Sequence, residues 1–325
     1  MNKPAKKYDV IVIGELNIDL ILDQIESFPE IGKEKLAREM TFALGSSSAI
    51  FASNLSSLGA SVAFIGKTGK DLLGNFVVQS LQQKKVDTQM ITQNEGLITG
   101  ATIGLNFRED RAMVTYPGAM EHLTDKDIPL DKLEEAKHLH ISSYFFQPGL
   151  QQYIGEIFRI AGEKGLTTSF DIQSDPGENW EINLKAILPY VDIFLPNEKE
   201  LLSITGSKTV EEAIEQLSSD VNILAVKLGN KGSACYHKGT ITYQPAFLHD
   251  KFIDAIGAGD SFDAGFIYQF LKGASIEQCQ IFGNYTGSYS TRSAGGTNAF
   301  EDINTFFSYA NTITGSQDGP ERQVT

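Results

Sequence analysis

A short glycine-rich segment that leads into a carboxylate is the part of the sequence best suited to chemistry. Residues 253 to 266 read Ile-Asp-Ala-Ile-Gly-Ala-Gly-Asp-Ser-Phe-Asp-Ala-Gly-Phe, so that Gly257, Ala258 and Gly259 precede Asp260. Glycines allow tight turns, and the start of a helix carries unpaired N–H groups that bind anions. A carboxylate repels an anion, so its presence there indicates a second task. Taking a proton from a hydroxyl that attacks a phosphoryl group fits this arrangement.

Two other interpretations fit the same residues. The first is a helix N-cap, because Gly and Asp commonly precede an apolar run with helical spacing. The second is a serine hydrolase built on Gly259-Asp260-Ser261, but no histidine falls near the predicted site. The choice between a cap and a catalyst depends on the elements that bring other polar residues to Asp260.

Alternating strand and helix patterns predict a mostly parallel sheet that is covered on both faces. Ligands of such sheets bind at the carboxyl ends of the strands. Asn17 and Asp19 follow a buried β-branched run and lie two residues apart, which places them on the same side of an extended segment. We therefore expect one sheet edge to collect the residues that follow predicted strands: Asp19, Ser142, Asp171, Asn197, Gly229 and the 257–260 turn.

Two further segments have clear patterns. Residues 97 to 117 contain two alternating stretches joined by Arg108-Glu-Asp-Arg111, which predicts a hairpin that can act as a lid and has solvated arginines at its tip. Gly66-Lys67-Thr68 is similar to the end of a P-loop, but Ser61 stands where that motif needs glycine. We expect a loop with a solvated lysine there.

Composition narrows the function classes. The chain has 325 residues and a net charge of −14, which favours one large domain and argues against nucleic acid or an anionic membrane as the main partner. No stretch approaches the ~20 apolar residues of a membrane span. Cys235 and Cys279 match no metal-site spacing and suit a reducing compartment, so we expect the cytoplasm. His138 and His140 alternate on a predicted strand without a third ligand, which favours a structural role.

The segment Asp254-x-x-Gly-Ala-Gly-Asp260-x-Phe-x-x-Gly265 resembles the C-terminal signature of the ribokinase family, also called PfkB-type carbohydrate kinases. The resemblance extends over residues 8 to about 310, through Gly14…Asp19, the Gly45 helix with Leu58-Gly59, Tyr116-Pro-Gly-Ala119, Asn197-x-x-Glu200 and Leu228-Gly229-x-x-Gly232. It implies a three-layer α/β/α fold with a mostly parallel central sheet and a small β-sheet lid. The implied kinase domain covers residues 1–313, with lid strands from about 15–45 and 97–117. Residues 314–325 are expected to form a flexible tail.

The resemblance also implies ATP- and Mg²⁺-dependent phosphorylation of a hydroxyl, usually on a sugar. Asp260 would be the general base, with the N–H groups of Gly257, Ala258 and Gly259 as the anion hole. The residues along the nucleotide would be Asn197, Lys227, Gly229, Gly232, Gly257, Gly259 and, near the adenine, Asn284. Asn197 and Glu200 would place Mg²⁺ largely through water, although their spacing fits a helix N-cap with Glu at N3 equally well. Carbonyls could hold K⁺ around Asp254, Ile256, Arg292, Ala294 and Gly295.

The sugar-binding segment departs from the family pattern. Where the family has Gly-Gly-x-x-x-Asn, this chain has Gly45-Ser46-Ser47-Ser48-Ala49-Ile50, so Ser46 replaces a glycine and Ile50 replaces the sugar-binding asparagine. The expected substrate-binding residues are Asn17, Asp19, Gly45, Ser46, Ile50 and Asp260. Family members that act on acidic sugars such as ketodeoxygluconate usually carry an arginine shortly before the region of Trp180, and residues 172–179 contain none.

These observations predict an ATP-dependent kinase of a neutral pentose or hexose such as ribose or fructose. A nucleoside kinase of the adenosine or inosine type is the alternative, and a non-catalytic sugar sensor is a remote one. A homodimer through the lid is also expected, because exposed strand edges can pair.

Overall fold

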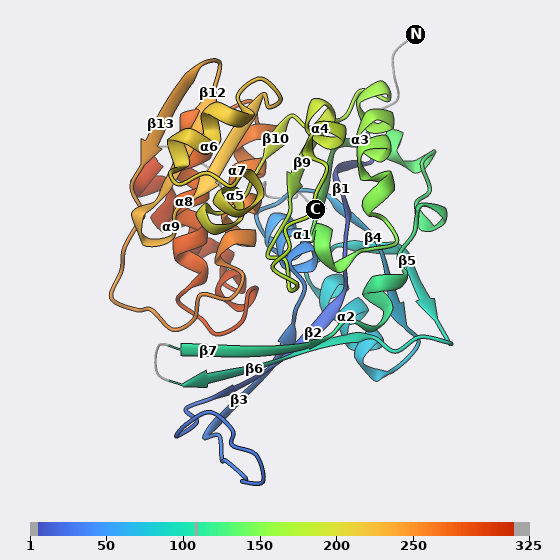
Figure 1. The fold of residues 1–325 in the computed structure, drawn as a ribbon, viewed down its shortest axis with the longest axis vertical. Coiled ribbons are helices and arrows are strands. Elements are labelled where there is room, and N and C mark those ends of the chain that lie inside the picture. Colours follow the sequence, from blue (N-terminus) through green and yellow to red (C-terminus); the bar gives the residue numbers. More distant parts are fainter. Residues whose placement is uncertain (1–5, 108–109, 315–325) are drawn as a thin grey trace.

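A large sheet forms the centre of the computed structural model, which describes residues 6–107 and 110–314 (Figure 1). Within those ranges nine strands run in the order β13-β12-β11-β10-β9-β8-β1-β4-β5. All neighbours from β11 to β5 are parallel, and β12 and β13 add an antiparallel edge. The strands are β1 (Tyr8–Ile13), β4 (Val62–Gly69), β5 (Asp87–Asn94), β8 (Ala136–Ser142), β9 (Thr167–Asp171), β10 (Ile193–Phe194), β11 (Ile223–Lys227), β12 (Ser233–His237) and β13 (Thr240–Gln244).

Helices cover both faces of this sheet because its strands carry apolar side chains on both. Along β1, Ile11 and Ile13 join one buried cluster with α3 (Ile154–Glu163), α4 (Leu184–Ile187), α5 (Glu198–Thr205) and α6 (Val210–Leu217). Val10 and Val12 point to the opposite cluster, with α1 (Ser47–Ser57), α2 (Leu72–Gln83), α7 (Ala258–Leu271), α8 (Ile276–Ser290) and α9 (Ile303–Thr314). The three-layer arrangement with a mostly parallel sheet is therefore confirmed.

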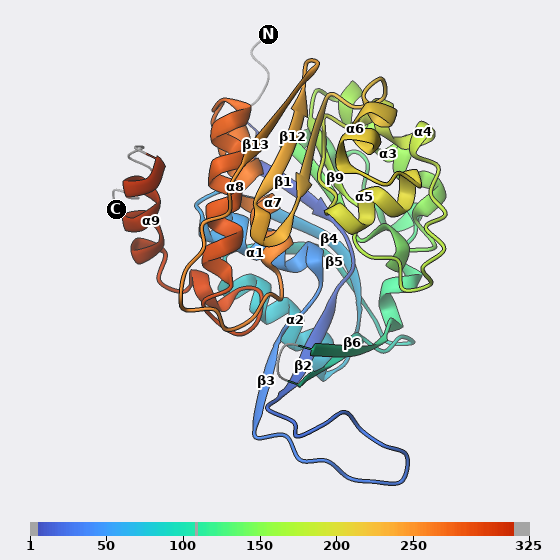
Figure 2. The same ribbon diagram turned by 60° about the vertical axis from the view of Figure 1, so that its left-hand side comes forward.

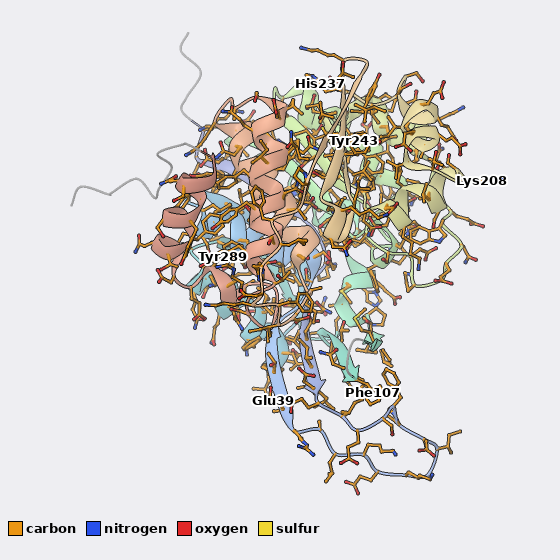
Figure 3. The ribbon with its side chains drawn as sticks, turned by 90° about the vertical axis from the view of Figure 1, so that its left-hand side faces the viewer. Glu39, Phe107, Lys208, His237, Tyr243 and Tyr289 are labelled. Carbon is orange, nitrogen blue, oxygen red and sulfur yellow. The ribbon has the colours of Figure 1, made fainter. Side chains whose placement is uncertain are left out.

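A second, four-stranded sheet projects from the body, and we refer to it as the lid after the prediction for its strands (Figure 2). Its order is β3-β2-β6-β7, with β2 (Asn17–Asp23), β3 (Glu39–Leu44), β6 (Gly100–Phe107) and β7 (Asp110–Tyr116). Figure 3 shows Glu39 and Phe107 on this projection, away from Tyr289 in the helical layer. Because β2 continues directly from β1, its first residues stand where the lid joins the main sheet.

The two faces of the lid differ in polarity. Asn17, Asp19 and Thr102 share one face, since Asp19 pairs with Thr102 across β2 and β6. The other face is apolar along a row in which Leu20 pairs with Phe42 and Ile103, and Ile103 pairs with Val114. Val114 is 68% exposed. The polar face therefore looks inward, and part of the apolar face remains uncovered.

One local prediction was wrong. Gly66-Lys67-Thr68 is not a loop but the end of β4, which continues to pair with β5 as far as Gly69. Lys67 is not solvated either, because its ammonium lies 2.7 Å from the Asp127 carboxylate and donates to the carbonyl of His122. The predicted tail was residues 314–325, but Thr314 is still the last residue of α9. The rest of that tail and the hairpin-tip side chains of Arg108 and Arg111 lie outside the described part of the chain.

Candidate active site

The Gly-Ala-Gly-Asp segment forms the first turn of α7, and Asp260 is not its N-cap. Gly257 is the capping residue and has φ = 71°, a left-handed conformation that favours glycine. A Cβ there would lie 2.6 Å from the Cα of Gly296, so the close approach also requires glycine. Asp260 is the third residue of the helix, with a side chain that is 7% exposed. The interpretation of this segment as a helix start is therefore confirmed, with Gly257 as the cap, whereas Asp260 lies inside the first turn.

The anion-binding potential of this turn comes from specific N–H groups. The N–H of Ala258 donates to the carbonyl of Ala255 at 3.2 Å, so it is already engaged. Within the described ranges, the N–H groups of Gly257 and Gly259 donate to no other group. These two groups, at the positive end of α7, remain available to an anion.

Two cavities meet at this turn. The small cavity, of about 280 Å³, lies against α7 and α8, and the large cavity, of about 1060 Å³, lies under the polar face of the lid. Both are lined by Lys227, Gly229, Ala255 and Gly259, and Asp260 faces the large one. These four residues form the wall between the cavities. Two ligands, one in each cavity, would come together next to Asp260.

The lid places polar side chains in the wall of the large cavity. Asn17 and Asp19 both line it, and Gly45 packs so closely behind them that a Cβ would lie 2.3 Å from Asp19 Oδ1. Asn17 donates through Nδ2 to Thr102 Oγ1 at 2.8 Å, while its buried Oδ1 has no partner among the described residues. An unpaired buried oxygen is costly, so this atom favours a ligand donor.

The Ser46–Ile50 segment forms the N-terminus of α1 and also lines the large cavity. Ser46 has φ = 70°, a backbone conformation that glycine adopts more readily than serine. Its hydroxyl donates to the carbonyl of Glu15 at 2.5 Å and accepts from the N–H of Ala49 at 3.0 Å. Ile50 packs closely against Gly257 and Gly296, so it brings apolar contact to this side of the turn.

Glu15 is a site residue that the sequence reasoning missed. It lies between β1 and β2, lines the large cavity and is 4% exposed. Its carboxylate accepts from the N–H of Ser48 at 3.3 Å and from the Ser48 hydroxyl, and burial raises its pKa. Ser48 in turn contacts Ser142 at 2.6 Å. Its place directly after a buried strand was the signal that could have found it.

A buried ion cluster lies beneath the wall. Lys227, the last residue of β11, places its ammonium 2.8 Å from Asp171 and 3.0 Å from Asp263. Asp171 ends β9, and Asp263 lies three residues after Asp260, on the same side of α7. Burial lowers the pKa of Lys227, but the two carboxylates outweigh it and raise that pKa overall. Lys227 is therefore a cation, but one already paired.

The carboxyl groups of this region have raised pKa values because they are buried and lie close to one another. Burial, and then the neighbouring Asp171, raises the pKa of Asp260 to about 7 and that of Glu200 to about 8. Burial also raises the pKa of Asp263 well above its usual range. A carboxyl whose pKa lies near neutrality can both accept and release a proton at physiological pH.

Asn197 and Glu200 form a capping box at the start of α5. The N–H of Asn197 donates to Glu200 Oε2 at 2.9 Å, and the N–H of Glu200 donates to Asn197 Oδ1 at 2.9 Å. The N-cap alternative is thus present in the structure. Both residues also line the large cavity. The described residues contain no group of three His, Cys, Asp or Glu side chains arranged to hold a metal ion.

The small cavity has mainly apolar and backbone walls. Gly229 (φ = 61°) and Gly232 (φ = 101°) line it, and a Cβ on Gly232 would lie 2.0 Å from the carbonyl oxygen of Gln244. Asn284 lines it from α8 and donates through Nδ2 to the carbonyls of Gln244 and Pro245 at 3.1 and 3.2 Å. All the residues predicted to lie along a nucleotide thus reach one of the two cavities.

The residues named for K⁺ belong to two loops that lie together. Asp254 accepts from the N–H of Gly295 at 3.2 Å and from that of Ile256 at 3.0 Å. The carbonyl of Ala294 accepts from Asn298 at 2.8 Å, and the guanidinium of Arg292 lies 5.0 Å from the ring centre of Tyr289. The structure therefore brings the two loops together beside the Gly257 turn.

The histidines on β8 have ordinary internal partners. His138 contacts Thr167 and Ser169 at 2.8 and 2.7 Å, and His140 contacts Ser169 at 2.8 Å and stacks on Phe51. Burial lowers the pKa of His138 to about 3, so it is neutral. Both geometry and charge agree with the structural role that was expected for them.

Comparisons with known proteins agree with this geometry. A model of the pfkB family of carbohydrate kinases matches residues 7–303. An uncharacterized sugar kinase of Archaeoglobus fulgidus is 30% identical over 242 residues, which cover 72% of this chain and 92% of that protein. The 5-dehydro-2-deoxygluconokinase of Lacticaseibacillus casei is 29% identical over 301 residues, covering 87% of this chain and 89% of that protein.

Solved structures show the same fold. Ribokinase of Arabidopsis thaliana, in a complex with ribose and ATP, superposes with a TM-score of 0.80 at 23% identity. The match covers 93% of this chain and 98% of that one. None of the helices in the described ranges is long and apolar enough to cross a membrane.

Proposed function

The chain belongs to the pfkB family of carbohydrate kinases, which transfer phosphate to alcohol groups, and we propose that it transfers the γ-phosphate of ATP to a hydroxyl of a small neutral sugar. The observation that carries this proposal is the position of Asp260 at the wall between two cavities. As general base, Asp260 accepts the proton of the attacking hydroxyl. The N–H groups of Gly257 and Gly259 stabilise the transferring phosphoryl group.

The small cavity suits the nucleotide. Its apolar side takes the base, with Asn284 near the adenine, and Gly232 leads from there to Lys227 and Gly229 in the wall. Mg²⁺ fits near Asn197 and Glu200, because both carry oxygen donors into the large cavity and their direct bonds to each other favour contact through water. When bound, Mg²⁺ neutralises charge on the phosphates. The carbonyls of the two loops around Asp254 and Ala294 suit K⁺ as an activator.

The charge of the large cavity favours a neutral substrate. Among the described residues that line it, Lys227 is the only Lys or Arg, whereas the acidic ones are Glu15, Asp19, Glu121, Glu200 and Asp260. Repulsion from these carboxylates, where they are ionised, opposes a carboxylate or phosphate carried by the substrate. Burial raises the pKa of Glu15, Glu200 and Asp260, so this repulsion grows as the pH rises. The name of the relative from Lacticaseibacillus casei implies an acidic sugar, so we infer that this chain differs from it in substrate. Asn17 and Asp19 bind the sugar hydroxyls, and Ile50 contributes apolar contact.

A nucleoside is the alternative acceptor. The large cavity of about 1060 Å³ is more than a monosaccharide needs, and Phe145, Phe146, Met113 and Met120 give it an apolar side where a base can pack. In that case the ribose occupies the same place near Asn17 and Asp19. The two acceptors share one mechanism.

We also propose a homodimer through the lid. Its support is the exposed part of the apolar lid face, where Met40, Val114 and Tyr116 are 67%, 68% and 53% exposed. Phe42 in the same face packs on Phe76 of α2, which covers one side only. Light scattering should give twice the monomer mass, and Val114→Glu should return the protein to a monomer. A wild-type monomer at micromolar concentration contradicts this proposal.

Substrate choice is tested by a coupled assay of ADP release with ATP, Mg²⁺ and a panel of acceptors. The panel contains neutral pentoses and hexoses, nucleosides, and aldonates and sugar phosphates as the anionic group. Turnover with a neutral sugar and none with the anionic group supports the proposal. Turnover with nucleosides alone selects the alternative, and turnover with an anionic sugar alone contradicts the charge argument.

A further inference from the structure

Gln173 has an unfavourable backbone conformation directly beside the catalytic turn. It follows β9 by two residues and has φ = 59°, in the left-handed region that side chains other than glycine rarely adopt. Such strain persists where the surrounding contacts fix the residue, and it often marks functional sites. Gln173 also lines the large cavity. Its side-chain contacts therefore need an explanation.

One amide nitrogen of Gln173 joins two carboxylates. Nε2 donates to Asp171 Oδ2 at 2.6 Å and to Asp260 Oδ1 at 2.9 Å. An amide NH₂ has two donors, so both are used in these bonds. The same Asp171 oxygen lies 2.8 Å from the ammonium of Lys227. A continuous chain of polar contacts thus runs from Lys227 through Asp171 and Gln173 to Asp260.

We propose that Gln173 is a positioning residue for the reaction, which fixes the Asp260 carboxylate against the anchored Asp171 and keeps it oriented toward the substrate hydroxyl. The inference rests on the proposed role of Asp260 as the base. Without a donor between them, the carboxylates of Asp171 and Asp260 repel each other. Asp260 would then turn away or hold its proton more tightly. A neutral amide is suited to this place because it donates to both carboxylates and adds no charge.

The competing explanation is that Gln173 merely fastens the loop after β9. The two explanations differ for Gln173→Gly, because glycine accepts φ = 59° without strain and removes only the side chain. A fastening role predicts a lower melting temperature and a normal pH profile. A positioning role predicts that the melting temperature stays the same or rises while the chemistry suffers.

The experiment compares Gln173→Gly with Gln24→Gly. Gln24 is also a left-handed glutamine (φ = 53°), but it is exposed at the end of β2 and its amide donates to Glu39. We expect Gln173→Gly to lower kcat by about 10- to 100-fold, because small displacements of a reacting group are this costly. We also expect the acid limb of kcat/KM to move up by about one pH unit, because the charged form of Asp260 loses a donor. Gln24→Gly should keep the wild-type kcat and profile.

Gln173→Glu provides a second variant of the same size if Gln173→Gly does not fold. It replaces the shared donor by a third carboxylate, so the acid limb should move up by at least as much as in Gln173→Gly. Wild-type kcat and an unshifted limb in either folded variant overturn the inference. A lower melting temperature with a normal profile assigns Gln173 to loop fastening and also overturns it.

The proposed base and the proposed positioning residue can fail separately. If Asp260→Asn retains wild-type turnover, the role of Asp260 fails and the positioning role fails with it. If Asp260→Asn is inactive but Gln173→Gly is normal, only the positioning role fails. If both hold, Gln173→Gly should not reduce the residual rate of Asp260→Asn further, because the group that it positions is already absent.

Discussion

The two cavities on either side of the Gly257 turn differ in how they would recognise a ligand. The small cavity offers apolar side chains such as Phe247 and Phe252, together with backbone groups that suit a flat base. The large cavity offers carboxylates and amides from the lid, which suit hydroxyls. Among the described residues, the two cavities share the wall of Lys227, Gly229, Ala255 and Gly259 and no other lining residue. We therefore expect each cavity to recognise its own ligand and the chemistry to take place beside the wall.

The wall is also where sequence-distant elements meet. The ends of β9 and β11 and the first turn of α7 bring Asp171, Lys227 and Asp260 together, and none of these strands or helices alone forms a site. A substitution at the wall should therefore weaken the binding of ligands in both cavities, whereas a substitution in one cavity should leave binding in the other cavity unchanged.

The largest expected effect follows from removing the shared cation. Lys227→Met leaves Asp171 and Asp263 buried without their partner, which should lower the free energy of unfolding by about 3–5 kcal/mol. Urea denaturation measures this. The control is Lys231→Met, whose ammonium lies 3.2 Å from Glu198 at an exposed position and which should change stability by less than about 1 kcal/mol. Equal losses in the two variants contradict the importance of the buried cluster.

A change confined to the large cavity should affect the acceptor only. Asp19→Asn weakens the hydrogen bonds to a sugar hydroxyl, and we expect the KM for the sugar to rise by about 10- to 100-fold while the KM for ATP stays constant. Asp23→Asn, on the same strand but outside the cavity, serves as the control and should leave both KM values unchanged. A rise in the KM for ATP in Asp19→Asn would show that the cavities are not separate.

The pH dependence of stability tests the charge at the wall. The pKa of Asp260 is raised to about 7 in the folded state and is near 4 in the unfolded state. Ionisation of Asp260 therefore lowers the free energy of unfolding as the pH rises above about 4, and the loss is complete above about pH 7. Asp260→Asn should therefore raise the free energy of unfolding by about 1–3 kcal/mol at pH 8 and by less at pH 5.5. If Asp260→Asn is less stable than the wild type at pH 8, the claim that the buried Asp260 carboxylate destabilises the folded state is contradicted.

The smallest expected effect concerns the backbone of Ser46, beside the proposed sugar site. Ser46→Gly relieves the left-handed strain at φ = 70° but removes a capping hydroxyl, so the melting temperature should change by a few degrees at most, with a rise if strain dominates. The KM for ATP should be unchanged. A large loss of stability would show that the bond from Ser46 to Glu15 matters more than the strain.

The fold was predictable because its signals are local. Buried runs such as Val10 to Ile13 alternate with amphipathic stretches, and this alone indicates a covered parallel sheet. The prediction for Lys67 failed because β4 continues through this residue by pairing with β5. Its ion-pair partner Asp127 is one that no local pattern reveals. The resemblance to the ribokinase family was confirmed by the family match over residues 7–303.

The site was predictable where one motif carries it and not where contacts between elements define it. Asp260 and its glycines stand together in the sequence, whereas Gln173 has meaning only through its bonds to Asp171 and Asp260. Asp263 was missed because its partner Lys227 lies 36 residues away. Substrate, K⁺ activation and the lid dimer stay predictions, since each depends on a molecule or copy outside the chain.

The most direct test of the central claim compares Asp260→Asn with the wild type, using the acceptor that the ADP-release panel identifies. If Asp260 is the base at the wall, the variant should lose turnover by on the order of 10²- to 10⁴-fold while its affinity for ATP, measured by calorimetry, remains within a few-fold of the wild type. Turnover near the wild-type value, with folded protein and normal ATP binding, would contradict the account.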